Sequence, residues 1–239
     1  MIPENVPFLD KLDVDVMLSG GAKGADTAWG IAANNAGHQV VHWSFEGHKS
    51  YHPEFTYKLT QEELEEADEY LEETNKTLKR SIPYFKPWIA NLLRRNWYQV
   101  KYIDAIYAVG TLNKKAVIKD ASDGKMYTKE YKDTMGVNGG TAWACQMFVD
   151  RWHKDKETYE PSMSDSLSAD PSKWFPPYNF VFCDQQKEKI FCWNIHAHHW
   201  VSREEYQWPI QKPQGIYAAV GTRDLNDFGK AFIEEMYNQ

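Results

Sequence analysis

The stretch "MLSGGAKGADTAWGIAANNAGHQVVHW" at residues 17–43 decides the fold, because a glycine turn there joins an apolar run to a helical pattern. The run at 14–18 predicts a short buried strand, and small apolar residues at helical spacing predict a helix over 24–35. Gly37 is a suitable residue to end that helix. Residues 38–45 predict a second strand, so the segment forms one βαβ unit and implies a parallel sheet.

The chain carries two more glycine turns of the same kind. Gly139 and Gly140 precede a helical pattern. The strand expected at 216–220 leads through Gly221 to a helix over 228–237. In an open α/β sheet such turns gather at the carboxyl ends of the strands, where ligands bind.

The remaining segments complete an α/β pattern. Helical spacing predicts helices over 60–80 and 88–100, and an apolar run predicts a strand over 103–109. Residues 179–194 predict a hairpin with a polar turn. The polar and aromatic segment 46–58 predicts a loop.

Three motifs together resemble one family. The segments "SGGAKGAD" at 19–26, "GGTAWA" at 139–144 and "VGTRDLNDFG" at 220–229 are similar to the turns of the SLOG superfamily. This superfamily unites Rossmann-like DNA-processing proteins of the Smf/DprA type with the LOG phosphoribohydrolases. The strand that ends in G-[ST]-R usually comes first in the family, whereas here it lies near the end of the sequence. The chain therefore resembles the circularly permuted YpsA-related branch.

The resemblance implies a fold and a domain organisation. We expect an α/β fold with a Rossmann-like parallel sheet flanked by helices and circularly permuted, with an inserted helix and a β-hairpin insertion. Residues 1–239 are expected to form a single domain. The segments at about 46–87 and 154–214 are expected to be insertions, because the family motifs lie outside them.

The glycine turns and their neighbours predict an anion-binding site. Glycine lets the backbone approach a phosphate, and the start of a helix directs N–H groups and partial positive charge at it. Arg223 offers a bidentate fork. Neighbouring helical residues diverge by about 100°, so only one of Arg94 and Arg95 faces the site, and the resemblance favours Arg95. The predicted ligand-binding residues are Ser19, Gly20, Gly21, Lys23, Asp26, Arg95, Asn96, Gly139, Gly140, Thr141, Gly221, Thr222 and Arg223.

The glycines, Lys23, Asp26 and Arg95 also have a purely structural explanation. The glycines can form tight turns without a ligand, and Lys23 can be an exposed lysine without a partner. Asp26 can orient a ribose hydroxyl, or it can simply favour the dipole of its helix. Arg95 can form a surface salt bridge.

One departure from the family pattern bears on catalysis. LOG enzymes carry a P-G-G-x-G-T-x-x-E pattern, whose Glu assists cleavage of the N-glycosidic bond. When Gly139 and Gly140 are placed on the paired glycines, Gln146 takes the position of that Glu. An amide cannot act as a carboxylate base. The expected function is therefore to bind a nucleotide or nucleotide-derived small molecule, ADP-ribose-like or a nucleoside phosphate, and to sense or sequester it without turnover, as in antiviral defence or anti-defence signalling. The alternative is an N-glycosidase of the LOG type.

Composition excludes several other classes. The 239 residues carry a formal net charge of −7, which argues against nucleic-acid binding and so against a DNA-handling role like that of DprA. No apolar run approaches the ~20 residues of a membrane span, and the N-terminal segment lacks the basic start and apolar middle of a signal peptide. We expect a cytoplasmic protein. By analogy with the family, the helix at 88–100 is a candidate interface for a homodimer or higher homo-oligomer.

The sequence offers little for a metal or a cofactor, and neither is predicted. Cys145, Cys183 and Cys192 lack the CxxC spacing of zinc sites, and buried free thiols are expected. A disulfide between Cys183 and Cys192 is the alternative. The histidines clustered at 196–199 could hold zinc, but solvated or hydrogen-bonded side chains are expected.

Overall fold

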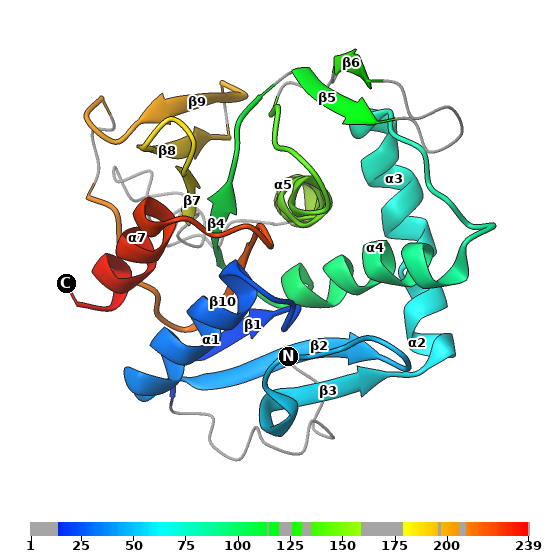
Figure 1. The fold of residues 1–239 in the computed structure, drawn as a ribbon, viewed down its shortest axis with the longest axis horizontal. Coiled ribbons are helices and arrows are strands. Elements are labelled where there is room, and N and C mark those ends of the chain that lie inside the picture. The colour runs from blue at the N-terminus through cyan, green and yellow to red at the C-terminus, as the bar shows by residue number, and fades with distance from the viewer. Residues whose placement is uncertain are drawn as a thin grey trace.

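The computed structural model is an α/β fold built on one eight-stranded sheet with helices on both faces (Figure 1). The α/β, Rossmann-like architecture expected from the glycine turns is confirmed. The structure describes residues 14–113, 115–119, 126–130, 135–158, 179–195, 197–205 and 209–238.

Six neighbouring strands of the sheet are parallel. In spatial order they are β3 (Thr56–Leu59), β2 (Gln39–Phe45), β1 (Val16–Ser19), β10 (Ile216–Gly221), β4 (Ala105–Gly110) and β7 (Asn179–Asp184). Two antiparallel strands extend the sheet beyond β7, namely β8 (Lys189–Asn194) and β9 (His199–Ser202). A separate hairpin consists of β5 (Lys115–Lys119) and β6 (Met126–Glu130). The strands β1 and β10 are far apart in sequence, yet they are neighbours near the centre of the sheet.

The helices divide between the two faces (Figure 1). One face is covered by α1 (Ala25–Asn35) and α7 (Asp227–Tyr237). The other carries α2 (Gln61–Glu66), α3 (Asp68–Leu78), α4 (Pro87–Val100) and α5 (Thr141–Thr158). The chain after β10 leads to α7 on the first face, whereas the chain after β4 leads to α5 on the second. A crevice outside the carboxyl ends of the strands is expected where the two directions part, between β10 and β4.

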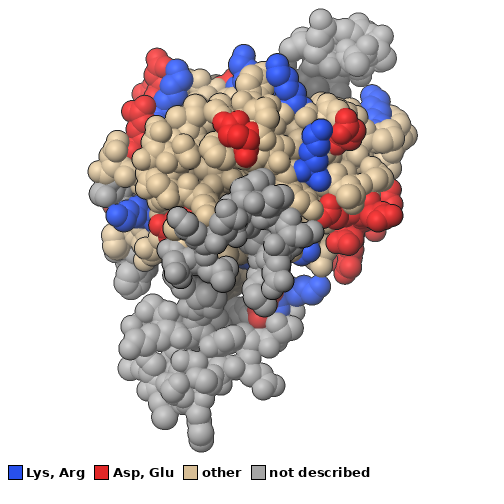
Figure 2. Space-filling model, turned by 90° about the horizontal axis from the view of Figure 1, so that it is seen from below, with Lys and Arg blue, Asp and Glu red and all other residues tan. Residues whose placement is uncertain are grey.

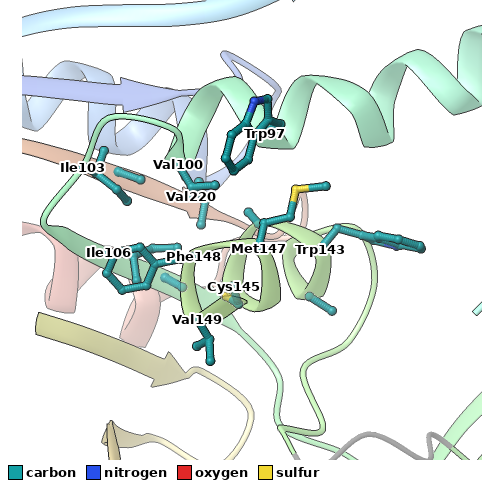
Figure 3. Close-up of a cluster of buried hydrophobic side chains, with 14 of the residues drawn as sticks. Trp97, Val100, Ile103, Ile106, Trp143, Cys145, Met147, Phe148, Val149 and Val220 are labelled. Atoms are coloured by element: carbon teal, nitrogen blue, oxygen red, sulfur yellow. The ribbon is translucent and has the colours of Figure 1, made fainter. Parts of the chain in front are cut away.

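An apolar core fixes α4 and α5 relative to the sheet (Figure 3). Trp97 and Val100 of α4 point toward Met147 and Phe148 of α5, and Ile106 of β4 lies beneath them. None of these five side chains is more than 5% exposed. Complete burial of such a side chain contributes about 1.5–3 kcal/mol. The N-terminal ends of the two helices are thereby held at a fixed distance from the strand ends.

A second core on the opposite face joins the two helices that follow β1 and β10. Trp29 of α1 is fully buried, and its ring centroid lies 5.8 Å from that of Phe232 and 5.9 Å from that of Tyr237, both on α7. Its centroid is also 6.2 Å from that of Tyr107 in β4. The helix after the first glycine turn therefore packs directly against the helix after the last one.

The prediction of a loop over 46–58 is wrong in its second half. A short 3-10 helix at Pro53–Phe55 leads into β3, which pairs in parallel with β2. Leu59 is buried and Tyr57 half-buried against the core that contains α4, while Lys58 is exposed. Alternation over only four residues, next to a polar segment, is too short to stand out in the sequence. The edge strand β9 was not expected either.

The helix expected over 60–80 is observed as two helices, α2 and α3, which meet at Ala67. Thr60 begins α2 with a capping box. Its hydroxyl accepts a hydrogen bond from the Glu63 N–H at 3.1 Å, and the Glu63 carboxylate accepts one from the Thr60 N–H at 2.7 Å. That the segments 46–87 and 154–214 are insertions into one domain stays a prediction.

One face of the molecule carries charges of both signs. On the face drawn in Figure 2, lysine and arginine side chains lie among aspartate and glutamate side chains. A nucleic-acid-binding surface needs a basic stripe, and the described residues on this face do not form one. In the described part of the chain, no helix has the length and apolarity that a bilayer crossing requires.

Candidate functional site

A cavity of about 400 Å³ lies at the carboxyl ends of β10 and β4, where the chain leaves the sheet toward opposite faces. Its volume is within the range of about 300–1,000 Å³ that is typical of small-molecule sites. The turn after β1, the ends of β4 and β10, the helix α4 and the start of α5 all contribute to its wall. The lining residues are Ala22, Asp26, Ile89, Leu92, Leu93, Arg95, Asn96, Gln99, Gly110, Thr111, Asn138, Gly139, Gly140, Thr141, Val220, Gly221, Thr222 and Arg223.

The structure brings most of the predicted site residues to this one cavity. Those that line it are Asp26, Arg95, Asn96, Gly139, Gly140, Thr141, Gly221, Thr222 and Arg223. Four others do not. Lys23 is exposed beside the cavity, and Ser19, Gly20 and Gly21 are buried behind its wall. The three glycine turns thus meet in space, although residues 21 and 221 are separated by most of the chain.

Asp26 ties the first glycine turn to the last one. Its carboxylate accepts hydrogen bonds from the N–H groups of Ala22 at 3.3 Å and Gly221 at 3.1 Å. The Ala25 N–H donates to the Thr222 carbonyl at 2.9 Å. Burial raises the pKa of the Asp26 carboxyl, and the Arg95 guanidinium and these N–H groups oppose that rise. Asp26 therefore has a structural role, and it also presents a carboxyl group to the cavity.

Glycines of the first turn make room for protein atoms. A Cβ on Gly20 would lie 2.5 Å from Nη2 of Arg95 and 2.8 Å from Oδ2 of Asp26. Gly21 has a φ of +64°, and a Cβ there would lie 2.6 Å from the Ser50 hydroxyl. Only glycine fits at either position. A Gly21→Val substitution, which the sequence alone would suggest as a way to block the ligand, is therefore expected to disturb the fold itself.

The second glycine turn is open. A Cβ on Gly139 or Gly140 would meet no atom of the described residues within 4 Å, and both residues are exposed on the cavity wall. Thr141 begins α5 directly after them. The first N–H groups of a helix carry partial positive charge and bind anions. Of the three turns, this one offers a ligand phosphate the freest approach to helix N–H groups.

Arg95 and Arg94 go to different partners, as their angular separation on α4 requires. Arg94 binds Asp68 of α3 through Nε and Nη2, both at 2.7 Å. Arg95 lines the cavity, and its Nη1 donates to the Gly20 carbonyl at 2.7 Å. Burial lowers the pKa of Arg95 to about 10, while the charge of Asp26 opposes this shift. Arg94 therefore forms a partly buried salt bridge, whereas the surface salt bridge that was the alternative for Arg95 is not observed among the described residues.

The wall combines charge with apolar surface. Arg223 is exposed at the end of β10, and Ile89, Leu92 and Leu93 of α4 form an apolar strip. A flat apolar group and an anionic group can therefore be bound in the same cavity.

Sequence reasoning missed four polar residues in or beside the cavity, besides several apolar residues and glycines of its wall. Gln99 is 2% exposed, and its Nε2 donates to Oδ1 of the Asn96 side chain at 3.3 Å. Its spacing of four residues from Arg95 on one helix would have placed it on the same face. Thr111 and Asn138 line the cavity but stand in no motif. His48 contacts Arg95 from the segment after β2, and no local pattern announces that contact.

Gln146 lies away from the cavity. It is 5% exposed, and its Nε2 donates to Oδ1 of Asp150 at 2.8 Å. Asp150 also accepts a hydrogen bond from Thr74 of α3 at 2.8 Å, and it lines a separate cavity of about 670 Å³ between α3, α4 and α5. The amide of Gln146 therefore joins α5 to a network with α3.

The three cysteines and the histidines at 196–199 were the candidates for a metal site. Cys145, Cys183 and Cys192 are buried free thiols. His198 stacks on His153 with centroids 5.4 Å apart, and His199 is exposed; His196 lies outside the described residues. The described residues contain no group of three or more His, Cys, Asp or Glu side chains placed to hold a metal ion.

No family model, curated protein or solved structure matches this chain.

Proposed function

We propose that the cavity at the ends of β10 and β4 binds a nucleotide or nucleotide-derived small molecule, either ADP-ribose-like or a nucleoside phosphate. The protein senses or sequesters this ligand without turning it over. The observation that carries the proposal is the convergence of two arginines, an open helix N-terminus and an apolar strip on one cavity. The phosphate is bound at Gly139 and Gly140, within reach of Arg223.

The strand order supports the proposed relation to the permuted branch of SLOG. When the short edge strand β3 is left out, and the strands are counted along the chain from β10, through β1 and β2 to β4 and β7, their spatial order is 3-2-1-4-5. That is the order of the doubly wound nucleotide-binding folds, whose ligand lies between strands 1 and 4. Here those two strands are β10 and β4. The proposal includes a cytoplasmic location and assembly into a homo-oligomer. Most of α4, the candidate interface, is instead buried within the subunit.

The second candidate is an N-glycosidase that cleaves a nucleoside phosphate. Asp26 is the one carboxyl group among the described lining residues, and burial raises its pKa. Such a group can act as a general acid. Against this role, both carboxylate oxygens of Asp26 already accept hydrogen bonds from backbone N–H groups. Gln146, which takes the position of the catalytic Glu, faces Asp150 instead of the cavity. Binding without turnover is the better-supported function.

One experiment separates the two candidates. The protein is incubated with AMP, ADP-ribose, cyclic ADP-ribose isomers and NAD, and the bound and released compounds are identified after denaturation. We expect at least one compound to be recovered unchanged from the protein. Free base together with ribose 5-phosphate would establish hydrolysis and overturn the first candidate.

Arg223→Ala and Lys23→Ala form a matched pair for locating the site. Both side chains are exposed cations beside the same turns, but only Arg223 lines the cavity. Loss of a charge-assisted contact weakens binding about tenfold or more. We therefore expect Arg223→Ala to lose affinity for the recovered compound and Lys23→Ala to keep it. Equal affinities for the two variants would place the ligand elsewhere.

A further inference from the structure

Gln185 directly follows β7, and its side chain holds the loop that follows β10. The residue is 8% exposed. Its Nε2 donates to the Asp224 carbonyl at 2.6 Å, and its Oε1 accepts from the Asn226 N–H at 3.0 Å. A backbone carbonyl can only accept and a backbone N–H can only donate, so these two partners set the orientation of the amide. Both polar ends of the Gln185 side chain are therefore bound to one loop.

The main chain of Gln185 adds to the same link. Its N–H donates to the carbonyl of Gly110, the last residue of β4, at 3.0 Å, and its carbonyl accepts from Nδ2 of Asn226 at 2.9 Å. Oδ1 of Asn226 in turn accepts from the Gly229 N–H in the first turn of α7, at 2.9 Å. One residue after β7 therefore joins the end of β4, the loop after β10 and the start of α7.

Arg223 lies in this loop between two points of attachment. Before it, the Thr222 N–H donates to the Val109 carbonyl and the Thr222 carbonyl accepts from the Ala25 N–H, both at 2.9 Å. After it, the loop is held by the amide of Gln185. The backbone at Arg223 is therefore fixed on both sides, although its side chain is exposed on the cavity wall.

The charge of Arg223 gives this attachment a purpose. Arg95 lines the same cavity, and although burial is the main cause that lowers the pKa of Arg95, the charge of Arg223 lowers it further. Two cations that line one cavity repel each other until an anion binds. A loop that is already held in place offsets this repulsion, so binding loses less free energy to the ordering of the loop.

We propose that Gln185 is a positioning residue for ligand binding: its amide holds the loop after β10 so that the Arg223 guanidinium reaches the anion bound at the start of α5. The proposal rests on the proposed function, because it assigns Arg223 to an anionic ligand. Without the amide, the loop keeps its attachment at Thr222 and loses the attachments at Asp224 and Asn226. Arg223 is then free to turn toward solvent, away from the second cation.

The test measures AMP binding to Gln185→Met, with Gln186→Met as the matched control. Methionine is close to glutamine in length but has no amide, and Gln186 is the exposed neighbour in the same turn. Net loss of a hydrogen bond of this kind corresponds to about threefold to tenfold in affinity. We expect Gln185→Met to weaken AMP binding by that factor and Gln186→Met to leave it unchanged. Equal AMP binding by the wild type and Gln185→Met would overturn the proposal.

The effect of Gln185 should depend on Arg223. In a protein that carries Arg223→Ala there is no guanidinium to position, so the addition of Gln185→Met should change AMP affinity by less than about twofold. A merely structural role of Gln185 would weaken binding by the same factor whether or not Arg223 is present. That result would also overturn the proposal.

A ligand-free measurement separates this proposal from the proposed function. Hydrogen exchange of the Asn226 N–H, which donates to Oε1 of Gln185, should be slow in the wild type and about tenfold faster or more in Gln185→Met. Exchange of the Thr222 N–H, which donates to β4, should change little. If AMP does not bind but Asn226 responds in this way, the positioning of the loop stands and the ligand assignment fails. Fast exchange at Asn226 in the wild type would overturn the positioning role whatever AMP does.

Discussion

Single residues of the three glycine turns serve different purposes. At Gly20 the space of a side chain is filled by Arg95 and Asp26, so the glycine allows protein groups to pack against the backbone. At Gly140 the same space is empty and opens on the cavity. A glycine in a motif therefore indicates close approach, and only the tertiary structure shows whether the approaching group is protein or ligand.

Gly140 allows the anion site to be tested without disturbing the fold. It precedes the first residue of α5, a position at which aspartate and serine are both favoured. Gly140→Asp adds a negative charge where we place the ligand phosphate, whereas Gly140→Ser adds a neutral group of similar size. We expect Gly140→Asp to weaken AMP binding more than tenfold and Gly140→Ser to weaken it only slightly, as measured by calorimetry.

Thermal unfolding of both variants is the control. Each should unfold at a temperature close to that of the wild type, because no atom lies within 4 Å of the added Cβ. AMP binding that is equally strong in both variants would contradict an anion site at the start of α5.

His42 predicts a dependence of stability on pH. The side chain is fully buried, and neither ring nitrogen has a hydrogen-bond partner among the described residues. Burial lowers its pKa from 6.5 to about 3. Between these values the unfolded chain binds a proton that the folded protein does not. The free energy of unfolding should therefore fall as the pH drops from 6.5 toward 3, by up to about 1.4 kcal/mol per pH unit from this group.

The measurement is the slope of unfolding free energy against pH for the wild type and for His42→Asn. His48, whose pKa is lowered to about 4, contributes in the same direction to both proteins. The difference between the two slopes therefore isolates His42. Identical slopes would mean that His42 is charged or solvated in the folded protein.

Among the structural elements, α4 shows how one helix positions two neighbouring arginines. Arg94 faces α3 and Arg95 faces the carboxyl ends of the strands. The Arg94 contact with Asp68 and the core contacts of Trp97 fix the rotation of the helix about its axis. That rotation decides which arginine reaches the cavity.

Asp68→Asn should weaken the attachment of α4 to α3 without affecting the ligand site directly. The variant replaces a charged, bidentate partner of Arg94 with a neutral one. Because the Asp68 side chain is 31% exposed, solvent reduces the loss, and we expect about 1 kcal/mol in unfolding free energy. Denaturant titration measures this change, and AMP binding should stay within about twofold. A large loss of binding would show that Asp68 acts on the cavity.

At the scale of the whole molecule, the site is assembled from segments near both ends of the sequence and from its middle. Contacts at the opposite end of the central strands, where β1, β2 and β10 begin, also bring distant segments together. Tyr237, at the end of α7, lies 2.8 Å from the Tyr217 hydroxyl, which lies 2.8 Å from Nδ1 of His38. His38 in turn lies 3.6 Å from the Asp15 carboxylate, just before β1. The end of α7 and the start of β1 are therefore close in space.

A permuted chain tests whether the fold depends on the present order of its elements. A flexible linker joins the two ends, and the chain is opened after Glu205, in the segment that precedes β10. We expect this protein to fold with an unfolding temperature close to that of the parent and to retain AMP binding. A chain opened after Leu93 instead cuts α4 and should fail to fold. Failure of both permutants would show that the order of β10 and β1 matters for folding.

Prediction from the sequence was most successful where local patterns were long. The βαβ unit at 14–45, the helix at 88–100 and the terminal strand and helix all appear as α/β elements in the structure. It failed for β3 and β9, because four residues at a sheet edge carry too little alternation. It also missed Gln99, Thr111, Asn138 and His48, which come to the cavity through packing and belong to no motif.

By itself, the sequence determined the α/β class and the three glycine turns, because strand alternation, helical spacing and the freedom of glycine are local properties of the chain. Only the tertiary structure decided that the turns after β1 and β10 pack against each other through Asp26. It also decided that Arg95 and not Arg94 lines the cavity, and that the open anion site lies at Gly140. These outcomes depend on which distant atoms fill the space beside each residue, and that is set when the core orients α4 and α5 on the sheet.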